Sequence, residues 1–256
     1  MQADLASAMR LVGAKILQCR KQGITGGKWE GTQFKALADL IADECLRAEL
    51  TRIADIPVVS EEDISSQTAD RPSQYWLIDP IDGTASFAQG FSGFVSQAAW
   101  IRGGQPWLAS VYAPALGRLY MAEQGKGASV NGQPISVKPL NRQQVTLIDN
   151  YPEPRGVAER LFRDFPCANY LESGSIGLKI CLVAEGTADI FVKDVRLRDW
   201  DVAAPHLVLQ EAGGVLTQFT GEVFEYGGGY EKHGLVVVSS VALLDEISEI
   251  IASYGE

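Results

Sequence analysis

The sequence predicts a layered α+β fold, and three observations support this prediction. Helical periodicity and strand-like apolar runs are mixed along the 256 residues. Several strand-like runs follow one another through short turns, and the regular alternation of strand and helix that a doubly wound parallel sheet needs is missing. With 46% hydrophobic residues, the chain can bury a substantial core as one large domain or two packed halves.

The first half, residues 1–140, is predicted to be α+β. Apolar residues recur at three- and four-residue steps from Leu5 to Cys19, which predicts an amphipathic helix that ends before Gly23. A second helical pattern covers residues 32–50. Residues 55–63, "DIPVVSEED", then form a short strand that ends in acids.

A buried strand and a meander complete this half. Residues 75–84, "YWLIDPIDGT", form an aromatic and aliphatic strand that stops at Asp79 and Pro80. Residues 93–137 contain strand-like runs separated by Gly-Gly, Ala-Pro and Asn-Gly turns, which predicts consecutive antiparallel strands.

The second half, residues 141–256, is predicted to be α/β and to pack with the first as one compact unit. Its expected strands and helices are these: strands at 144–150, 188–192, 214–222 and 233–240, and helices at 175–186, 201–214 and 241–255.

Composition excludes some partners. The chain carries 22 Lys+Arg against 32 Asp+Glu, a formal charge of -10, whereas a nucleic acid polymer or an anionic membrane needs a basic face. Neither a membrane span nor a signal peptide is recognisable, so we expect a soluble cytoplasmic protein. Four cysteines without CxxC spacing predict reduced, mostly buried thiols rather than structural zinc.

The end of the strand at residues 75–84 carries the strongest functional pattern. Pro80 forces Asp79 into an extended conformation, and Gly83 permits a sharp turn. Asp79 and Asp82 can then face one cavity, where two like charges need a cation between them. An ordinary Asp-Gly turn is the plainer interpretation.

Acids stand in similar places elsewhere. Glu61 and Glu62 follow a strand, and Asp199 and Asp201 flank Trp200 near the start of a helix. Oxygen ligands without nearby His or Cys suit hard cations, Mg²⁺ above all. Taken singly, Asp201 could merely complement a helix dipole, and the acids at 61–63 could form a solvated loop.

Five stretches together resemble the inositol monophosphatase superfamily of Mg²⁺-dependent, typically lithium-sensitive phosphomonoesterases. They are "ALADLIADE", "VSEED", "WLIDPIDGTASF", "GKGASVNGQPISV" and "WDVAAPHLVLQEAGG". The resemblance covers most of the chain, and it implies the layered αβαβα sandwich that this superfamily shares with fructose-1,6-bisphosphatases, usually as a homodimer.

The resemblance also implies roles for single residues. The metal ligands matched by position are Glu61, Asp79, the Ile81 carbonyl, Asp82 and Asp201. Thr84 matches the threonine that helps to activate the attacking water, and Asp39 matches its acidic partner, although the segment before Asp39 departs from the family pattern. Gly83 and Thr84 would offer amides to the phosphate, beside Asp82 and Asp201. Glu62 is either a neighbour of the metal site or a plain surface acid.

The implied mechanism is in-line hydrolysis without a covalent enzyme intermediate. Metal ions activate a water molecule and neutralise the leaving oxygen, while Glu61 and the Thr84–Asp39 pair orient and deprotonate that water.

Within the superfamily, the pattern is closest to bacterial 3'(2'),5'-bisphosphate nucleotidases, which act on 3'-phosphoadenosine 5'-phosphate. "GLKICLVAEGTAD" carries this likeness and would place Lys179 near the nucleotide, although a helix-surface lysine is an equally good interpretation. Two departures count against it: Ala85 and Ser86 replace a basic-acidic pair, and a "GPT"-like turn before Trp200 is missing. Arg196 and Arg198 there could meet a second phosphate, but most such arginines are solvated.

Other functions stay open. Inositol-1-phosphate hydrolysis fits "ASFAQGF", although the inositol-contacting glutamate of the family should fall near Val192 or Lys193, neither of which can replace it. A sugar phosphate is a third candidate substrate. A non-catalytic phosphate-binding relative is the alternative from another class. His206 is expected to be a packing residue, and Trp200 to fix Asp201 by burying its ring.

Overall fold

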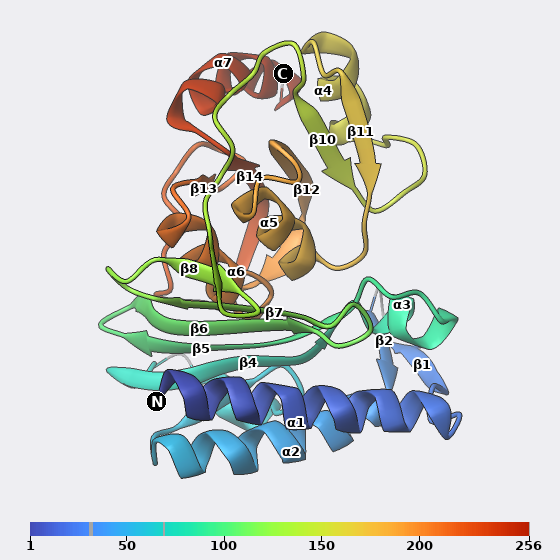
Figure 1. The fold of residues 1–256 in the computed structure, drawn as a ribbon, viewed down its shortest axis with the longest axis vertical. Coiled ribbons are helices and arrows are strands. Elements are labelled where there is room, and N and C mark those ends of the chain that lie inside the picture. Colours follow the sequence, from blue (N-terminus) through green and yellow to red (C-terminus); the bar gives the residue numbers. More distant parts are fainter. Residues whose placement is uncertain (31–32, 69, 256) are drawn as a thin grey trace.

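In the computed structural model, a seven-stranded and a five-stranded β-sheet alternate with three layers of helices (Figure 1), and a third sheet has two strands. The structure describes residues 1–30, 33–68 and 70–255. Each helix layer corresponds to a separate hydrophobic cluster, one on either side of the molecule and one between the sheets. The layered α+β prediction and the αβαβα sandwich are therefore confirmed.

Helices α1 (Gln2–Lys21) and α2 (Leu37–Ile53) cover the outer face of the first sheet (Figure 1). The apolar stripe that the sequence predicts on α1 is fully buried, and it packs with Trp76 and Ile78 of the sheet. Burial of this stripe is what holds the helix pair, because helices of this length gain most of their stability from packing.

The first sheet has seven strands in the order β3-β4-β5-β6-β7-β8-β9. Their bounds are β3 (Val58–Ser60), β4 (Gln74–Asp82), β5 (Val95–Arg102), β6 (Gln105–Ala113), β7 (Arg118–Glu123), β8 (Ala128–Val130) and β9 (Gln133–Ile135). All neighbours are antiparallel except β3 and β4, which are parallel with Ser60 opposite Ile78. Because β3 and β4 are parallel and in this register, the residue after Ser60 and the residue after Ile78 lie side by side.

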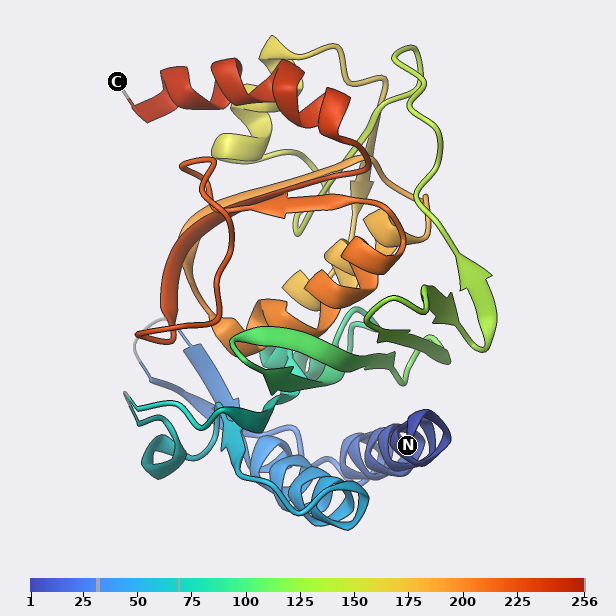
Figure 2. The ribbon, with the colours of Figure 1, turned by 90° about the vertical axis from the view of Figure 1, so that its left-hand side faces the viewer.

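Helices α5 (Ile176–Ala184) and α6 (Asp199–Glu211) lie between the two sheets (Figure 2). Eight of the nine residues of α5, from Gly177 to Ala184, are buried. A helix that is apolar on all sides belongs in a core, and α5 and α6 join both sheets into the largest hydrophobic cluster.

The second sheet has five strands in the order β11-β10-β12-β14-β13. Their bounds are β10 (Thr146–Asp149), β11 (Asn169–Glu172), β12 (Ile190–Arg198), β13 (Val215–Thr217) and β14 (Glu231–Val238). β10 is parallel to both neighbours, and β14 is antiparallel to both of its own. Helices α4 (Val157–Asp164) and α7 (Val241–Ala252) cover its outer face (Figure 2).

The helix predicted over residues 32–50 is wrong at its start. Residues Gln33–Ala36 form strand β2, which pairs with β1 (Gly27–Glu30) as a hairpin, and the helix begins at Leu37. Thr32 lies outside the described residues. Strand β1, which ends three residues before Gln33, pairs with this segment in place of the helix. Periodicity in a single sequence does not reveal such pairing.

Further elements differ from the prediction. Helix α4 and strand β11 were not expected, and the strand predicted over 214–222 is reduced to β13 with one bridge from Thr217 to Val223. Short helices occur at α3 (Thr84–Gln89), η1 (Ile64–Ser66) and η2 (Ser253–Gly255). The division into two halves at residue 140 stays a prediction.

The four cysteines are free, with Cys19 and Cys181 buried and Cys45 and Cys167 partly exposed. Among the described residues, none of the helices has the length and apolar character that a membrane crossing requires.

Candidate metal centre

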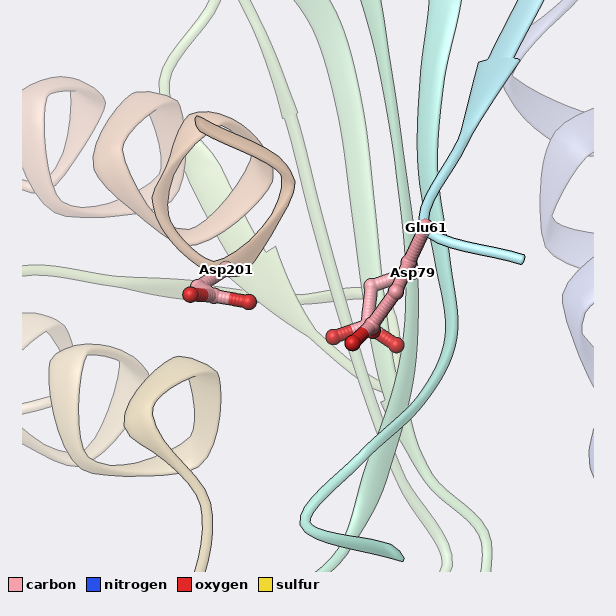
Figure 3. Close-up of side chains that lie close together, drawn as sticks. All are labelled: Glu61, Asp79 and Asp201. Atoms are coloured by element: carbon pink, nitrogen blue, oxygen red, sulfur yellow. The ribbon is translucent and has the colours of Figure 1, made fainter. Parts of the chain in front are cut away.

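Three carboxylates from separate parts of the chain meet between the first sheet and α6. One oxygen each of Glu61, Asp79 and Asp201 lies within 4.8 Å of the others. Figure 3 shows Glu61 and Asp79 side by side, with Asp201 facing them from the start of α6. The sequence predicts this convergence, although 140 residues separate Glu61 from Asp201.

Local geometry explains why Glu61 and Asp79 are neighbours. β3 runs parallel to β4, so that the residue after Ser60 emerges beside the residue after Ile78. The Glu61 N–H donates to the Ile78 carbonyl at 3.3 Å, which extends the ladder by one residue. The pairing of β4 with β5 then shifts its register between Asp79 and Asp82, at the position of Pro80.

Asp201 is fixed by the first turn of α6. Its Oδ2 accepts the Arg198 backbone N–H at 2.7 Å, so this carboxylate caps its own helix. The Trp200 carbonyl accepts a hydrogen bond from Gln97 Nε2 at 2.9 Å, which ties the start of α6 to β5. The Trp200 ring is buried against Tyr230, as the sequence led us to expect.

Asp82 lies outside the group of three. Its Oδ2 accepts the Gly177 N–H at 2.7 Å, at the first turn of α5. The backbone makes this contact possible, since Ser175 N–H donates to the Gly93 carbonyl at 2.7 Å and a Cβ on Gly174 would lie 1.9 Å from that same oxygen. A side chain at residue 174 would therefore push α5 away from Asp82.

Thr84 and Asp39 meet as the sequence predicts. Thr84 Oγ1 lies 2.9 Å from Asp39 Oδ1 and 3.0 Å from the Ile81 carbonyl oxygen. Asp39 is 3% exposed on α2, although its segment departs from the family pattern. Gly83 has φ 89°, a left-handed conformation that glycine adopts without strain, and α3 begins immediately after it.

Burial and mutual repulsion shape the electrostatics of the carboxylates. Loss of water raises the pKa values of Glu61 and Asp79 well above the ordinary range, and the neighbouring acids raise them further. Burial and then the Asp82 charge raise the pKa of Asp201 to about 7. Burial also raises the pKa of Asp82, but the Gly177 N–H and the Lys179 charge oppose that rise.

The donor set fits a hard divalent cation. Carboxylate oxygens are the ligands that Mg²⁺ and Ca²⁺ prefer. Asp79 Oδ1 is buried, and the described residues offer it no hydrogen-bond partner. An uncompensated buried carboxylate oxygen is costly unless a positive charge reaches it, and a bound cation supplies that charge.

Lys179 lies close to this centre on α5 and is fully buried. Its Nζ donates to Asn150 Oδ1 at 2.6 Å and to the Gly174 carbonyl. Burial, and then the charge of Lys193, lowers the pKa of Lys179 to about 7. It is therefore not a surface lysine of the helix. A role in substrate binding stays a prediction.

Sequence reasoning missed a buried ion pair next to the centre. Arg71 Nη2 lies 2.6 Å from Asp199 Oδ2, and Lys232 Nζ lies 3.6 Å from Asp199 Oδ1. Arg71 also donates to the Gly228 and Gly229 carbonyls and stacks on the Tyr230 ring. The pattern around Asp199 could not reveal partners 128 and 33 residues away.

Three other expected side chains can be placed. The side chains of Arg196 and Arg198 both pair with Glu231 on β14. His206 packs against Phe224 and Tyr226, and its Nδ1 lies 2.8 Å from the Tyr226 hydroxyl, so it is a packing histidine as expected. The Glu62 N–H donates to Ser60 Oγ at 3.2 Å.

The five-layer sandwich places between its two sheets an oxygen-only site that could hold a hard cation. Comparison of sequences identifies the family: residues 3–255 match the inositol monophosphatase family, and the chain belongs to it. This is a family of metal-dependent phosphatases, so the resemblance in the sequence is confirmed.

Individual relatives carry different names. The chain is 35% identical over 199 residues to the 3'(2'),5'-bisphosphate nucleotidase CysQ of Salmonella typhimurium, covering 74% of this chain and 78% of the relative. It is 32% identical over 203 residues to the Nus factor SuhB of Vibrio cholerae, covering 75% and 73%. The solved structure of a Thermotoga maritima IMPase superposes with a TM-score of 0.80 at 25% identity, covering 97% of this chain and 95% of the other.

Proposed function

We propose that this chain is a Mg²⁺-dependent phosphomonoesterase that hydrolyses a small phosphorylated metabolite. One observation carries the proposal: Glu61, Asp79 and Asp201 gather their oxygens within 4.8 Å in a member of a phosphatase family. Asp79 is buried, and Glu61 and Asp201 are half-buried. Three acids this close repel one another, and one cation among them would relieve that repulsion.

Glu61, Asp79, Asp82, Asp201 and the Ile81 carbonyl are the proposed metal ligands. When bound, Mg²⁺ would acidify a water molecule and neutralise charge on phosphate oxygens. Asp82 would share its second oxygen with the metal, because Gly177 occupies its Oδ2.

The protein side of proton transfer falls to Thr84, Asp39 and Glu61. Asp39 orients the Thr84 hydroxyl at 2.9 Å, so the Thr84 oxygen is directed to accept a hydrogen bond from the attacking water. Burial and the charge of Asp201 raise the pKa of Glu61, so this glutamate can accept a proton at a pH closer to neutral than an ordinary glutamate. The amides of Gly83 and Thr84 would hold the phosphate.

The proposed substrate is a 3'(2'),5'-bisphosphate nucleotide such as 3'-phosphoadenosine 5'-phosphate. The 35% identity to CysQ supports this choice. Two lysines lie on the Asp82 side of the site: the buried Lys179, and Lys193, which pairs with Asp149 Oδ1 at 2.6 Å. A second phosphate on the substrate would have these two cationic side chains as candidate partners.

Inositol 1-phosphate is the second candidate substrate, supported by the 25% identity to the Thermotoga maritima IMPase. The residue after Lys193 is an acid, Asp194, at the point where β12 shifts its register. Asp194 Oδ1 lies 2.7 Å from His233 Nε2 and both side chains are largely exposed, so an inositol ring would compete with His233 for it.

Side-by-side kinetics decide between these substrates. We expect kcat/KM on 3'-phosphoadenosine 5'-phosphate to exceed kcat/KM on inositol 1-phosphate and fructose 1,6-bisphosphate, each at saturating Mg²⁺. A strong preference for the inositol ester would overturn the nucleotide assignment and leave the phosphatase assignment intact.

A non-catalytic phosphate-binding function is the alternative from another class, and the likeness to a protein named as a Nus factor makes it worth testing. We expect Mg²⁺-dependent phosphate release that Asp82→Asn abolishes and that the exposed-acid variant Glu153→Gln keeps. No release from any of the three esters would favour the binding function.

A further inference from the structure

Helix α2 presents a row of three charged side chains toward the loops that carry Glu61 and Thr84. Asp39, Asp43 and Arg47 are spaced by four residues, so they lie on one face of the helix. Asp39 belongs to the site already described through Thr84. Asp43 and Arg47 contact the segment around Glu61 instead.

Asp43 is joined to the residue immediately before Glu61. Ser60 Oγ donates to Asp43 Oδ1 at 2.5 Å, and Ser60 is fully buried. The same Ser60 oxygen accepts the Glu62 N–H at 3.2 Å. One hydroxyl thus bridges the residues on both sides of Glu61, and Asp43 fixes the direction of that hydroxyl.

Arg47 holds Asp43 and closes the loop from its far side. Its Nε donates to Asp43 Oδ2 at 2.8 Å, and its Nη2 donates to Asp63 Oδ2 at 3.0 Å. Its Nη1 reaches the Val58 carbonyl at 3.4 Å. The Asp43 and Arg47 side chains are 14% and 25% exposed, so water competes little for these contacts.

The loop itself is short and closed on its own polar groups. Gln67 Nε2 donates to the Ser60 and Glu61 carbonyls at 2.9 and 3.2 Å, and Ser66 Oγ accepts the Ser60 N–H at 3.1 Å. These contacts shape the loop but do not attach it to the rest of the protein. The Asp43–Arg47 pair attaches the loop to α2, in addition to the ladder to β4.

From this arrangement we propose that Asp43, held by Arg47, is a positioning residue that acts through Ser60 to aim the Glu61 carboxylate into the metal centre. The proposal rests on the proposed function. Helix α2 would then position two catalytic residues, Thr84 through Asp39 and Glu61 through Asp43 and Ser60. Both water-activating groups would be held by one rigid helix, which fixes the distance between them.

The test compares three variants with one control on the same helix. Asp43→Ala and Ser60→Ala each remove one partner of the contact, and the double variant removes both. Glu49→Ala is the matched control, because Glu49 pairs with Arg52 on α2 and contacts neither loop. Measured quantities are the calorimetric Mg²⁺ affinity, kcat, substrate KM at saturating Mg²⁺, and the melting temperature.

We expect Asp43→Ala to weaken Mg²⁺ binding and lower kcat by about 10-fold each, the lower end for loss of a partner that orients a ligand. Substrate KM at saturating Mg²⁺ should stay within about twofold, because the phosphate contacts are untouched. The double variant should lose no more than Asp43→Ala alone, since the two residues act as one unit. Glu49→Ala should match the wild type.

The outcomes are distinguishable. If Asp43→Ala and Glu49→Ala share the same Mg²⁺ affinity and kcat, or if the double variant shows additive losses, the positioning role is wrong while the phosphatase function stands. If the wild type hydrolyses no ester, the proposed function fails, and the Mg²⁺ affinities still decide the positioning role. A wild type that binds no Mg²⁺ contradicts both. Should Asp43→Ala not fold, the milder Ser60→Ala carries the comparison.

Discussion

Two groups of charged side chains meet at the start of α6, one around Asp199 and one around Asp201, and they are built in opposite ways. Asp199 is fully buried and is balanced by Arg71 at 2.6 Å and Lys232 at 3.6 Å. Asp201, two residues later, faces Glu61 and Asp79, which carry the same charge (Figure 3).

The difference separates a structural charge cluster from a binding site. In the first group the protein provides its own counter-ions, so the charges hold three segments together. In the second group three acids face one another, and burial together with the charges of the neighbouring acids raises their pKa values. A buried group of like charges persists where something from outside balances it.

The largest expected effect follows from a substitution in the balanced group around Asp199. Asp199→Ala leaves Arg71 buried without its counter-ion, so we expect the free energy of unfolding to fall by about 3–5 kcal/mol. Urea denaturation of the metal-free protein measures this. Arg71 also donates to the Tyr75 hydroxyl at 3.1 Å. A loss below about 1 kcal/mol would mean that this hydroxyl and the Gly228 and Gly229 carbonyls are sufficient partners for Arg71.

The same kind of change in the like-charged group should act on activity rather than stability. Asp79→Asn removes one repelling charge, so we expect the metal-free protein to melt no lower than the wild type. Activity should fall more than about 100-fold, since loss of a ligand exceeds the 10- to 100-fold cost of losing an outer partner. Phosphate release and differential scanning fluorimetry in EDTA give both values, with Glu153→Gln as control. A lower melting temperature with normal activity would mean that Asp79 supports the fold rather than metal binding, contrary to the role assigned to the like-charged group.

The sequence predicted the like-charged group because each acid ends a strand or begins a helix in a recognisable motif. The balanced group was missed because its pairing depends on which distant segments the fold brings together. The same limit hid the contact between Asp43 and Ser60. It also hid the hairpin β1–β2, whose strand Gln33–Ala36 was assigned to a helix.

The titration of Asp201 makes the stability of the metal-free protein depend on pH. Its pKa is about 7 in the metal-free fold and about 4 when unfolded. A group with a raised pKa in the folded state gives its full stabilisation below pH 4 and loses it as pH rises to 7. The metal-free Asp201→Asn variant has no such loss, so its melting temperature relative to the wild type should rise by a few degrees across this window. A constant difference would contradict the pKa shift.

The smallest expected effect concerns Lys179, which is buried on α5 between the two sheets. Lys179→Met should lower kcat/KM on 3'-phosphoadenosine 5'-phosphate by up to about 10-fold, the weight of one charge-assisted contact. Inositol 1-phosphate, with a single phosphate, should be affected less. Equal losses on both esters would assign Lys179 to packing and to its bond with Asn150.

The most direct test of the whole account is a crystal of the protein soaked in Mn²⁺, a substitute for Mg²⁺ with a measurable anomalous signal. The predicted result is an anomalous peak within ligand distance of Glu61, Asp79 and Asp201, which disappears in Asp79→Asn. Absence of any peak there at saturating Mn²⁺, with the three carboxylates turned away from one another, would contradict the account.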